Sequence, residues 1–381
     1  MRITEVRTHV VGNPWKNWVF ARVETDEGLY GVGEGTVMYF ARTVESAILE
    51  LAPFVIGTDP MQVEMLLQKL IRDPYADGGQ IHMAAVAAIE MACWDIVGKA
   101  LRQPVYNLWG GRCHDRLRAY ANGWYRGDRT PELFAAKAQE VTARGYTALK
   151  FDPFGDAWRT LPNREFTLSL EIIAAVRSAV GNEVDLLIEG HSRFSPATAI
   201  QVAKAIEPFR PMWFEEPVHH GNIAAIVEVA RASPVPIATG ESFSSKYQFA
   251  ELLKHDVISI YQPEPLNLGG ILPARKIIDA IDAHYGMVAP HSAQGPIAAA
   301  ACVQLNACSP NFLIHEFFES SESWEKQMVR FPIEVVDGYI AVSDRPGLGI
   351  DLDLDETARH PYSQRFHLPL FKPGWEKREP Q

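Results

Sequence analysis

Short apolar runs alternate with amphipathic stretches through the middle of this chain. The apolar runs are rich in β-branched residues, and each following stretch repeats apolar residues at a helical spacing. Ala199, Val202, Ala203 and Ile206 form one such helical stripe, behind Ser195 as a candidate N-cap. The predicted strands are residues 118–125, 147–152, 184–189, 212–215, 236–240, 257–262, 286–290 and 312–316.

Strands that are separated by helices imply parallel, right-handed βαβ units. Eight such units fit a β/α barrel, which takes roughly 250 residues. A doubly wound open sheet is the alternative architecture. No Gly-x-Gly-x-x-Gly loop opens an early helix in this sequence, so the usual sign of a dinucleotide site in such a sheet is missing.

The two ends of the chain carry a different pattern. Residues 3–11 and 18–25 are predicted to pair as antiparallel strands, and residues 81–100 to form a long apolar helix. We expect an α/β protein with three parts. Residues 1–116 form an α+β capping domain, residues 117–330 a modified, TIM-like β/α barrel, and residues 331–381 a C-terminal segment that returns to the cap.

Charge and composition narrow the classes of partner. The formal net charge of −11 argues against nucleic acid or an anionic membrane as the main partner. No uninterrupted apolar run resembles a signal peptide or a membrane span. The four cysteines lack metal-ligand spacing. We therefore expect a cytoplasmic protein with reduced thiols that acts on a small molecule.

Ionisable residues end seven consecutive predicted strands. In a β/α barrel the active site lies at the C-terminal ends of the strands, so these residues converge on one mouth. One or two polar loop residues would carry no information, but seven exceed what solvation of the loops requires. They are Lys150 with Asp152, then Glu189, Glu215, Glu241, Glu264, His291 and Glu316.

Three of these residues, Glu189, Glu215 and Glu241, are evenly spaced on neighbouring strands. Taken singly, each is equally well explained as a surface glutamate. Brought together, three carboxylates repel one another unless a cation lies between them. An all-oxygen ligand set suits Mg²⁺, whereas zinc would be expected with histidine or cysteine. We predict one Mg²⁺ per subunit.

Several strings of the sequence resemble, in order and spacing, the mandelate racemase branch of the enolase superfamily. The resemblance covers nearly the whole chain, from the join of cap and barrel within residues 81–111 to residues 346–349. The strings are Trp213-Phe214-Glu215-Glu216-Pro217, Thr239-Gly240-Glu241-Ser242, Gln262-Pro263-Glu264, Gly269-Gly270 and Ala289-Pro290-His291.

That resemblance implies roles for five of the residues. Glu189, Glu215 and Glu241 are the Mg²⁺ ligands, with Glu189 where the family more often has aspartate. His291 is the base, paired with Glu264, again where aspartate is more usual. A carboxylate bonded to one imidazole nitrogen fixes the tautomer and raises the basicity of the other nitrogen.

The remaining polar strand ends are assigned to the substrate. His191 lies two residues after Glu189, on the same side by strand alternation, and resembles the histidine with which acid-sugar dehydratases protonate a leaving hydroxyl. Lys150 suits a substrate carboxylate. Asp152 replaces the second lysine of the racemases and is expected to bond a substrate hydroxyl or to pair with Lys150. Glu316 is expected to hydrogen-bond the substrate carboxylate, which requires a raised pKa.

Loops of the cap are expected over the barrel mouth, at residues 13–20, 35–40 and 74–82. Histidines at 219 and 220 follow a turn near the mouth and are more often bystanders, and His315 should point away by alternation. The candidate substrate contacts from the cap are Trp15, Lys16, Trp18, Tyr39, Tyr75 and His82.

Together these residues predict a Mg²⁺-dependent acid-sugar dehydratase, a hydro-lyase that resembles galactonate or gluconate dehydratases. It would convert an aldonate or aldarate to a 2-keto-3-deoxy acid through an enediolate. A racemase, epimerase or cycloisomerase that uses the same enediolate is the second hypothesis. A non-catalytic barrel that binds sugar acid or metal is the third. The family resemblance also implies a homo-oligomer.

Overall fold

Eight parallel strands form a closed barrel in the computed structural model, which describes residues 1–381 except 14–15, 77, 320–322, 365–368 and 380–381. Neighbouring strands follow chain order from β4 to β10, and β11 pairs with β4. A parallel bridge between Val288 and Phe312 completes the ring, so an open doubly wound sheet is excluded. The strands are β4 (Arg116–Asn122), β5 (Ala148–Phe151), β6 (Asp185–Glu189), β7 (Trp213–Glu215), β8 (Ile237–Thr239), β9 (Ile260–Tyr261), β10 (Met287–Val288) and β11 (His315–Phe318).

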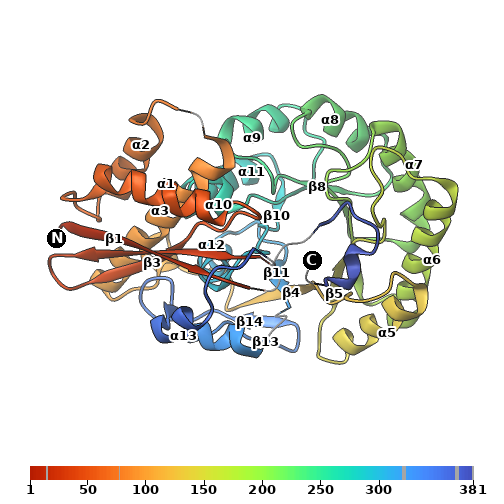
Figure 1. Cartoon of the computed structure of the whole chain (residues 1–381). Helices are drawn as coiled ribbons and strands as arrows, with labels where there is room; N and C mark the ends of the chain where they lie inside the picture. The colour runs from red at the N-terminus through yellow and green to blue at the C-terminus, as the bar shows by residue number, and fades with distance from the viewer. Residues whose placement is uncertain (14–15, 77, 320–322, 365–368, 380–381) are drawn as a thin grey trace.

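Helices surround this barrel, as the alternating pattern predicts (Figure 1). Ser195 caps one of them: its side chain accepts a hydrogen bond from the backbone N–H of Thr198 (3.3 Å), and Pro196 occupies the first helical position. The helices are α5 (Pro131–Thr142), α6 (Asn163–Val180), α7 (Pro196–Ile206) followed by the 3₁₀ turn η1 (Glu207–Phe209), α8 (Ile223–Ala232), α9 (Lys246–Leu253), α10 (Pro265–Leu268), α11 (Ile271–Ala283) and α12 (Pro296–Ala307).

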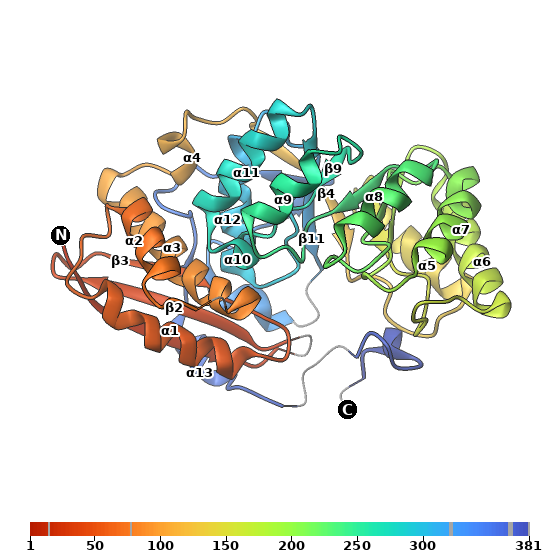
Figure 2. The same cartoon turned by 90° about the horizontal axis from the view of Figure 1, so that it is seen from above.

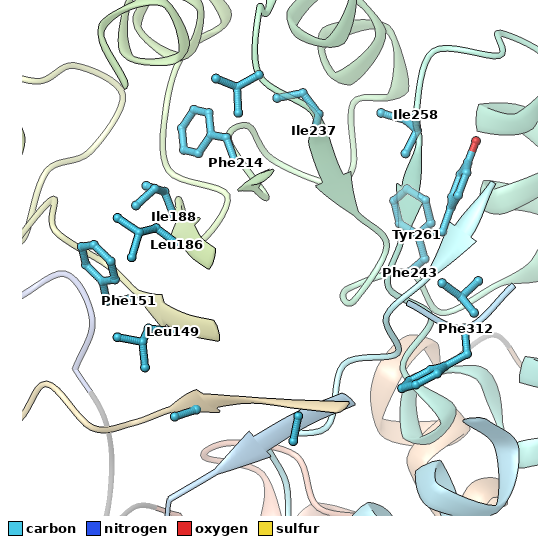
Figure 3. Close-up of a cluster of buried hydrophobic side chains, with 14 of the residues drawn as sticks. Leu149, Phe151, Leu186, Ile188, Phe214, Ile237, Phe243, Ile258, Tyr261 and Phe312 are labelled. Carbon is cyan, nitrogen blue, oxygen red and sulfur yellow. The ribbon is translucent and has the colours of Figure 1, made fainter. Parts of the chain in front are cut away.

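Side chains alternate between the two faces of the barrel wall. Those that point outward pack against the helices, and Figure 3 shows Leu149, Phe151, Leu186 and Ile188 among them. The same alternation places the functional strand ends on the inward face. The buried residues that fill the interior are Tyr120, Ala148, Leu187, Trp213, Ala238, Ile260, Ala289 and Ile314.

The cap is a three-stranded antiparallel sheet backed by helices. The predicted pairing of the first two strands is confirmed, from Ile3 opposite Thr25 to Val11 opposite Trp18. The apolar helix α3 is long enough to cross a membrane, but 78% of its most apolar window is buried, so it is a core helix of this fold. The elements are β1 (Ile3–Val11), β2 (Trp18–Thr25), β3 (Tyr30–Glu34), α1 (Ala41–Val55), α2 (Val63–Arg72), α3 (Gly79–Leu101) and the short α4 (Val105–Leu108).

The C-terminal segment touches both the cap and the barrel. Its hairpin of β13 (Val335–Val336) and β14 (Tyr339–Ala341) pairs with β4 of the barrel. Helix α13 (Leu354–Arg359) packs on β1, and residues near 375 lie across the barrel mouth, where Gly127 N–H donates to the Glu376 carbonyl (3.0 Å). Figure 2 shows α13 beside α1 of the cap. The other elements are η2 (Ser323–Met328), β12 (Val329–Arg330), β15 (Asp351–Leu352) and η3 (Trp375–Lys377).

Candidate active site

Three carboxylates meet at the C-terminal ends of neighbouring strands. Glu189 ends β6, Glu215 ends β7 and Glu241 follows β8, and one oxygen of each lies within 4.8 Å of the others. Burial raises the pKa of all three, to about 7 for Glu215, where the charge of Glu189 adds to the effect. Such a cluster is unfavourable when ionised, and a hard divalent cation would relieve the repulsion. The donor set therefore fits a metal site.

A buried ammonium group lies among these carboxylates. Lys150 Nζ is 2.6 Å from Glu215 Oε1, 2.8 Å from Glu316 Oε1 and 3.5 Å from Glu189 Oε2. Burial lowers the pKa of Lys150, but Glu215 and Glu316 outweigh it and raise that pKa well above its ordinary value. Lys150 is thus held as a cation at the inner end of the site.

His291 and Glu264 form a dyad beside the carboxylates. His291 Nδ1 is 2.5 Å from Glu264 Oε2, so the longer glutamate side chain does reach the ring. The other oxygen of Glu264 accepts the backbone N–H of Leu266 (3.1 Å) at the start of α10, which fixes the carboxylate. Burial lowers the pKa of His291, but Glu241, Glu316 and Glu264 raise it to about 10. Its Nε2 lies 3.5 Å from Glu241 Oε2.

A second dyad lies on the neighbouring strands. His191 Nδ1 is 2.6 Å from Asp152 Oδ2, and the same oxygen accepts a hydrogen bond from the guanidinium of Arg193. Asp152 is fully buried, and its other oxygen accepts the backbone N–H of Phe154 (2.9 Å). The expectation that Asp152 bonds a substrate hydroxyl or pairs with Lys150 needs correction, because both of its oxygens are already engaged below His191.

Glu316 also differs from its expectation. Burial raises the pKa of Glu316, but Lys150 and His291 outweigh it and hold the pKa below its usual range. One oxygen bonds Lys150 and accepts the side-chain amide of Asn122 (2.9 Å), and the other accepts Ser292 N–H (2.8 Å). Every one of these partners is a donor, so Glu316 is an ionised acceptor rather than the protonated donor that the sequence suggested.

A cavity of about 580 Å³ covers the strand ends. Barrel residues form its floor, among them Lys150, Glu189, His191, Glu241 and His291. The C-terminal segment adds a wall through Leu370 and Trp375. The predicted cap loops do line it, although mostly through other side chains than those chosen from the sequence: Lys16, Thr36, Val37, Met38, Phe40, Gly78, Gln80 and Ile81.

Among the candidates from the cap, Lys16 alone lines this cavity within the part of the chain that the structure describes. Tyr39 and Tyr75 are 60% and 97% exposed. His82 bonds the carbonyl of Leu70 (3.0 Å), and Trp18 packs in the core. Trp15 lies outside the described residues. In a loop, alternation does not govern side-chain direction, so the sequence identified the loops but not the contacts.

Three other histidines considered from the sequence lie in different environments. His220 lines the cavity, with His219 stacked on it at a ring-centroid distance of 4.3 Å. His315 is fully buried on the outward face, where Asn306 bonds its Nδ1 (2.9 Å), as alternation predicted.

Two residues that contact His191, Arg193 and Trp375, were not among the candidates from the sequence. Arg193 follows His191 by two positions in the turn after β6, where strand alternation no longer applies, and its proximity in sequence to His191 was the only available signal. Trp375 lines the cavity with its ring 6.2 Å from that of His191, and Trp375 Nε1 donates to the Gly155 carbonyl (3.0 Å). No local pattern signals such a contact, because it joins residues far apart in the sequence.

A capped barrel with three metal-competent carboxylates beside a histidine dyad is the architecture of the enolase superfamily, and comparison with known families agrees. Residues 133–357 match the enolase C-terminal domain-like family, and residues 6–110 match the mandelate racemase/muconate lactonizing enzyme N-terminal domain. The chain belongs to the mandelate racemase/muconate lactonizing enzyme family.

Two named dehydratases and one solved structure are similar to this chain over most of its length. The chain is 33% identical to a D-gluconate/D-galactonate dehydratase of Picrophilus torridus, covering 95% of this chain and 93% of that protein. It is 35% identical to a D-galactonate dehydratase of Verminephrobacter eiseniae, covering 93% and 92%. A solved mandelate racemase/muconate lactonizing enzyme from Jannaschia sp. CCS1 superposes with a TM-score of 0.89 at 34% identity, covering 97% of this chain and 100% of that one.

Proposed function

We propose that this protein dehydrates a sugar acid to a 2-keto-3-deoxy acid. The observation that carries the proposal is the presence of two histidine–carboxylate dyads, His291–Glu264 and His191–Asp152, at one cavity beside the carboxylate cluster. Loss of water across two carbons needs one group to take a proton and another to give one. Relatives named as gluconate and galactonate dehydratases support the same reaction.

We further propose that Glu189, Glu215 and Glu241 hold Mg²⁺. When bound, Mg²⁺ supplies positive charge that stabilises the carboxylate of the substrate as it gains electron density. Lys150 is already a buried cation beside these ligands, and it would hold the same end of the substrate. Glu316 keeps Lys150 in place by its ion pair.

His291 is the proposed base. Nδ1 is occupied by Glu264, so Nε2 is the nitrogen that takes the proton from C2 of the substrate. The charges of Glu241 and Glu316 keep His291 protonated in the metal-free protein, and a cation held by Glu241 would offset them and let Nε2 act as a base. The electron pair of that C–H bond moves into the carboxylate and gives an enediolate. Glu264 stabilises the imidazolium that results, in the manner of a buried carboxylate behind a catalytic histidine.

His191 is the proposed acid for the second half of the reaction. As the enediolate collapses, the C3–O bond breaks. The hydroxyl leaves as water with a proton from Nε2 of the imidazolium form of His191, whose Nδ1–H stays bonded to Asp152. The enol that remains gains a proton at C3, loses the proton of its hydroxyl group at C2 and becomes the 2-keto-3-deoxy acid. The elements of one water molecule are lost, and no oxidant or reductant is needed.

A panel of sugar acids, including gluconate and galactonate, tests this function in the presence of Mg²⁺. We expect at least one acid to give a 2-keto-3-deoxy product, which is measured as its semicarbazone, and His291→Asn to give none. Exchange of the C2 hydrogen in D₂O without loss of water would favour a racemase or epimerase instead. No exchange and no product from any acid would reject an enzyme that uses this enediolate chemistry.

A further inference from the structure

The turn that carries His191 has an unusual backbone. His191 and Ser192 follow one another with φ of 47° and 57°, in the left-handed region that residues other than glycine rarely adopt. The turn is held by bonds from Ser192 N–H to the Glu216 carbonyl (2.7 Å) and from Ser192 Oγ to Glu216 Oε2 (2.7 Å). Strained backbone of this kind persists only where surrounding contacts determine it.

Asp152 holds an N–H of His191 at Nδ1, both in the neutral ring and in the imidazolium that acts as the acid. An ionised carboxylate only accepts hydrogen bonds, so the 2.6 Å contact is made by an N–H at Nδ1 of the ring. Nδ1 then points down into the protein. His191 also lines the cavity, and Nε2 is therefore the nitrogen that it presents to a substrate.

Arg193 holds the Asp152 carboxylate in its position against His191. Its side chain is fully buried, and its guanidinium donates to the carbonyls of Gly190 (3.0 Å) and Gly155 as well as to Asp152. Asp152 is the carboxylate that offsets this buried charge, and the pair lies at the base of the β6 turn. A buried pair that is fully hydrogen-bonded fixes geometry, because breaking it leaves a charge without a partner.

We propose that Asp152 and Arg193 are positioning residues that aim Nε2 of His191 at the leaving hydroxyl of the substrate. The proposal rests on the dehydratase function above and extends it to a second assembly, separate from the His291–Glu264 dyad. It assigns to Asp152 a role that needs no contact with substrate. The two dyads share no carboxylate, so removal of a proton and departure of the hydroxyl are separable by mutation.

Asp152→Asn is the direct test, in a comparison of three rates on the same protein. Dehydration of the sugar acid should fall by at least about 100-fold, the usual contribution of a positioned acid. Exchange of the C2 hydrogen in D₂O should persist, since His291 performs it. A 3-deoxy-3-fluoro analogue should still lose fluoride at nearly the wild-type rate, because fluoride leaves without a full proton transfer.

Asp156→Asn, an exposed aspartate in the same loop, is the matched control and should leave all three rates unchanged. If Asp152→Asn dehydrates normally, or if it loses exchange, dehydration and fluoride release in equal measure, the positioning role is rejected. Equal loss would mean that Asp152 only supports the fold.

Asp152→Asn leaves buried Arg193 without a counter-charge, and such a variant can fail to fold. Asp152→Glu keeps the negative charge and provides a second test. It moves the carboxylate by one methylene, so we expect a lower ratio of dehydration to exchange than in the wild type. An unchanged ratio would overturn the proposal. Failure of the wild type to dehydrate any sugar acid would reject the dehydratase function itself, which is a different outcome from normal dehydration by the variant.

Discussion

The carboxylate of Glu90 on α3 of the cap accepts the backbone N–H of Ile271, the first residue of barrel helix α11 (2.9 Å). Its second oxygen accepts Leu272 N–H (2.9 Å) and Trp94 Nε1–H (2.9 Å). These N–H groups belong to a helix start that has no side-chain cap of its own. The cap is thus fastened to the barrel through a helix N-terminus.

Glu90→Ala should destabilise the protein by roughly 2 kcal/mol or more, because it leaves one buried and two partly buried donors without acceptors. Chemical unfolding followed by tryptophan fluorescence measures the change. Glu50→Ala, at an exposed position of α1, is the matched control and should cost little. Equal stability of the two variants would contradict a fastening role for Glu90.

The same residue predicts a pH dependence of stability. Burial raises the pKa of Glu90 from 4.5 to about 8, despite its three N–H donors. Between these values the folded state binds a proton that the unfolded state has lost. The stability that this group contributes is therefore present below pH 4.5 and is lost as pH rises through about 8. The slope of unfolding free energy against pH in this window should flatten in Glu90→Gln, and an identical slope would argue against the shift.

Removal of metal should lower the melting temperature, since Glu189, Glu215 and Glu241 then repel one another within a buried site. Added Mg²⁺ should raise the melting temperature in a concentration-dependent way. Glu215→Gln should weaken Mg²⁺ binding by roughly tenfold or more, measured by calorimetry. Glu228→Gln, exposed on α8, should bind Mg²⁺ as the wild type does. Equal binding by both variants would place the metal elsewhere.

Substitution of His291 and of His191 should affect different steps of the reaction. His291→Asn should abolish both C2 exchange and dehydration, because it removes the base. His191→Asn should slow dehydration by about 10²- to 10⁴-fold while C2 exchange continues. Proton NMR in D₂O follows both processes in one sample. Loss of exchange in His191→Asn would show that the two histidines do not act in separate steps.

Trp375 should influence turnover although it lies far from His191 in sequence. Trp375→Ala opens the cavity beside the His191 ring and loses the bond to Gly155, so kcat/KM should fall. Trp375→Phe keeps an aromatic side chain at the wall and loses only that hydrogen bond. For this variant kcat/KM should fall less. The ratio of kcat/KM between the two variants distinguishes the contribution of the aromatic ring from that of the hydrogen bond. Identical losses would assign the whole effect to the bond.

The inward-facing part of the site was predictable because strand alternation is regular. The C-terminal ends of the predicted strands identified Glu189, Glu215 and His291, and alternation placed His315 on the outward face. The charge state of Glu316 was not predictable, since it depends on Lys150, which comes from another strand. Loop side chains such as Tyr75 were assigned to the cavity by proximity alone, and the structure turns that residue to solvent.

The wall that Trp375 contributes has a consequence for how the protein is made and handled. The proposed catalytic groups of the barrel, up to Glu316, precede Trp375 in the chain and are therefore synthesised before it. Until Trp375 has been made, the cavity beside His191 lacks one side of its wall. A purification tag at the C-terminal end would follow the segment that carries Trp375 and this wall, whereas one at the N-terminal end would lie at the far end of the cap (Figure 1).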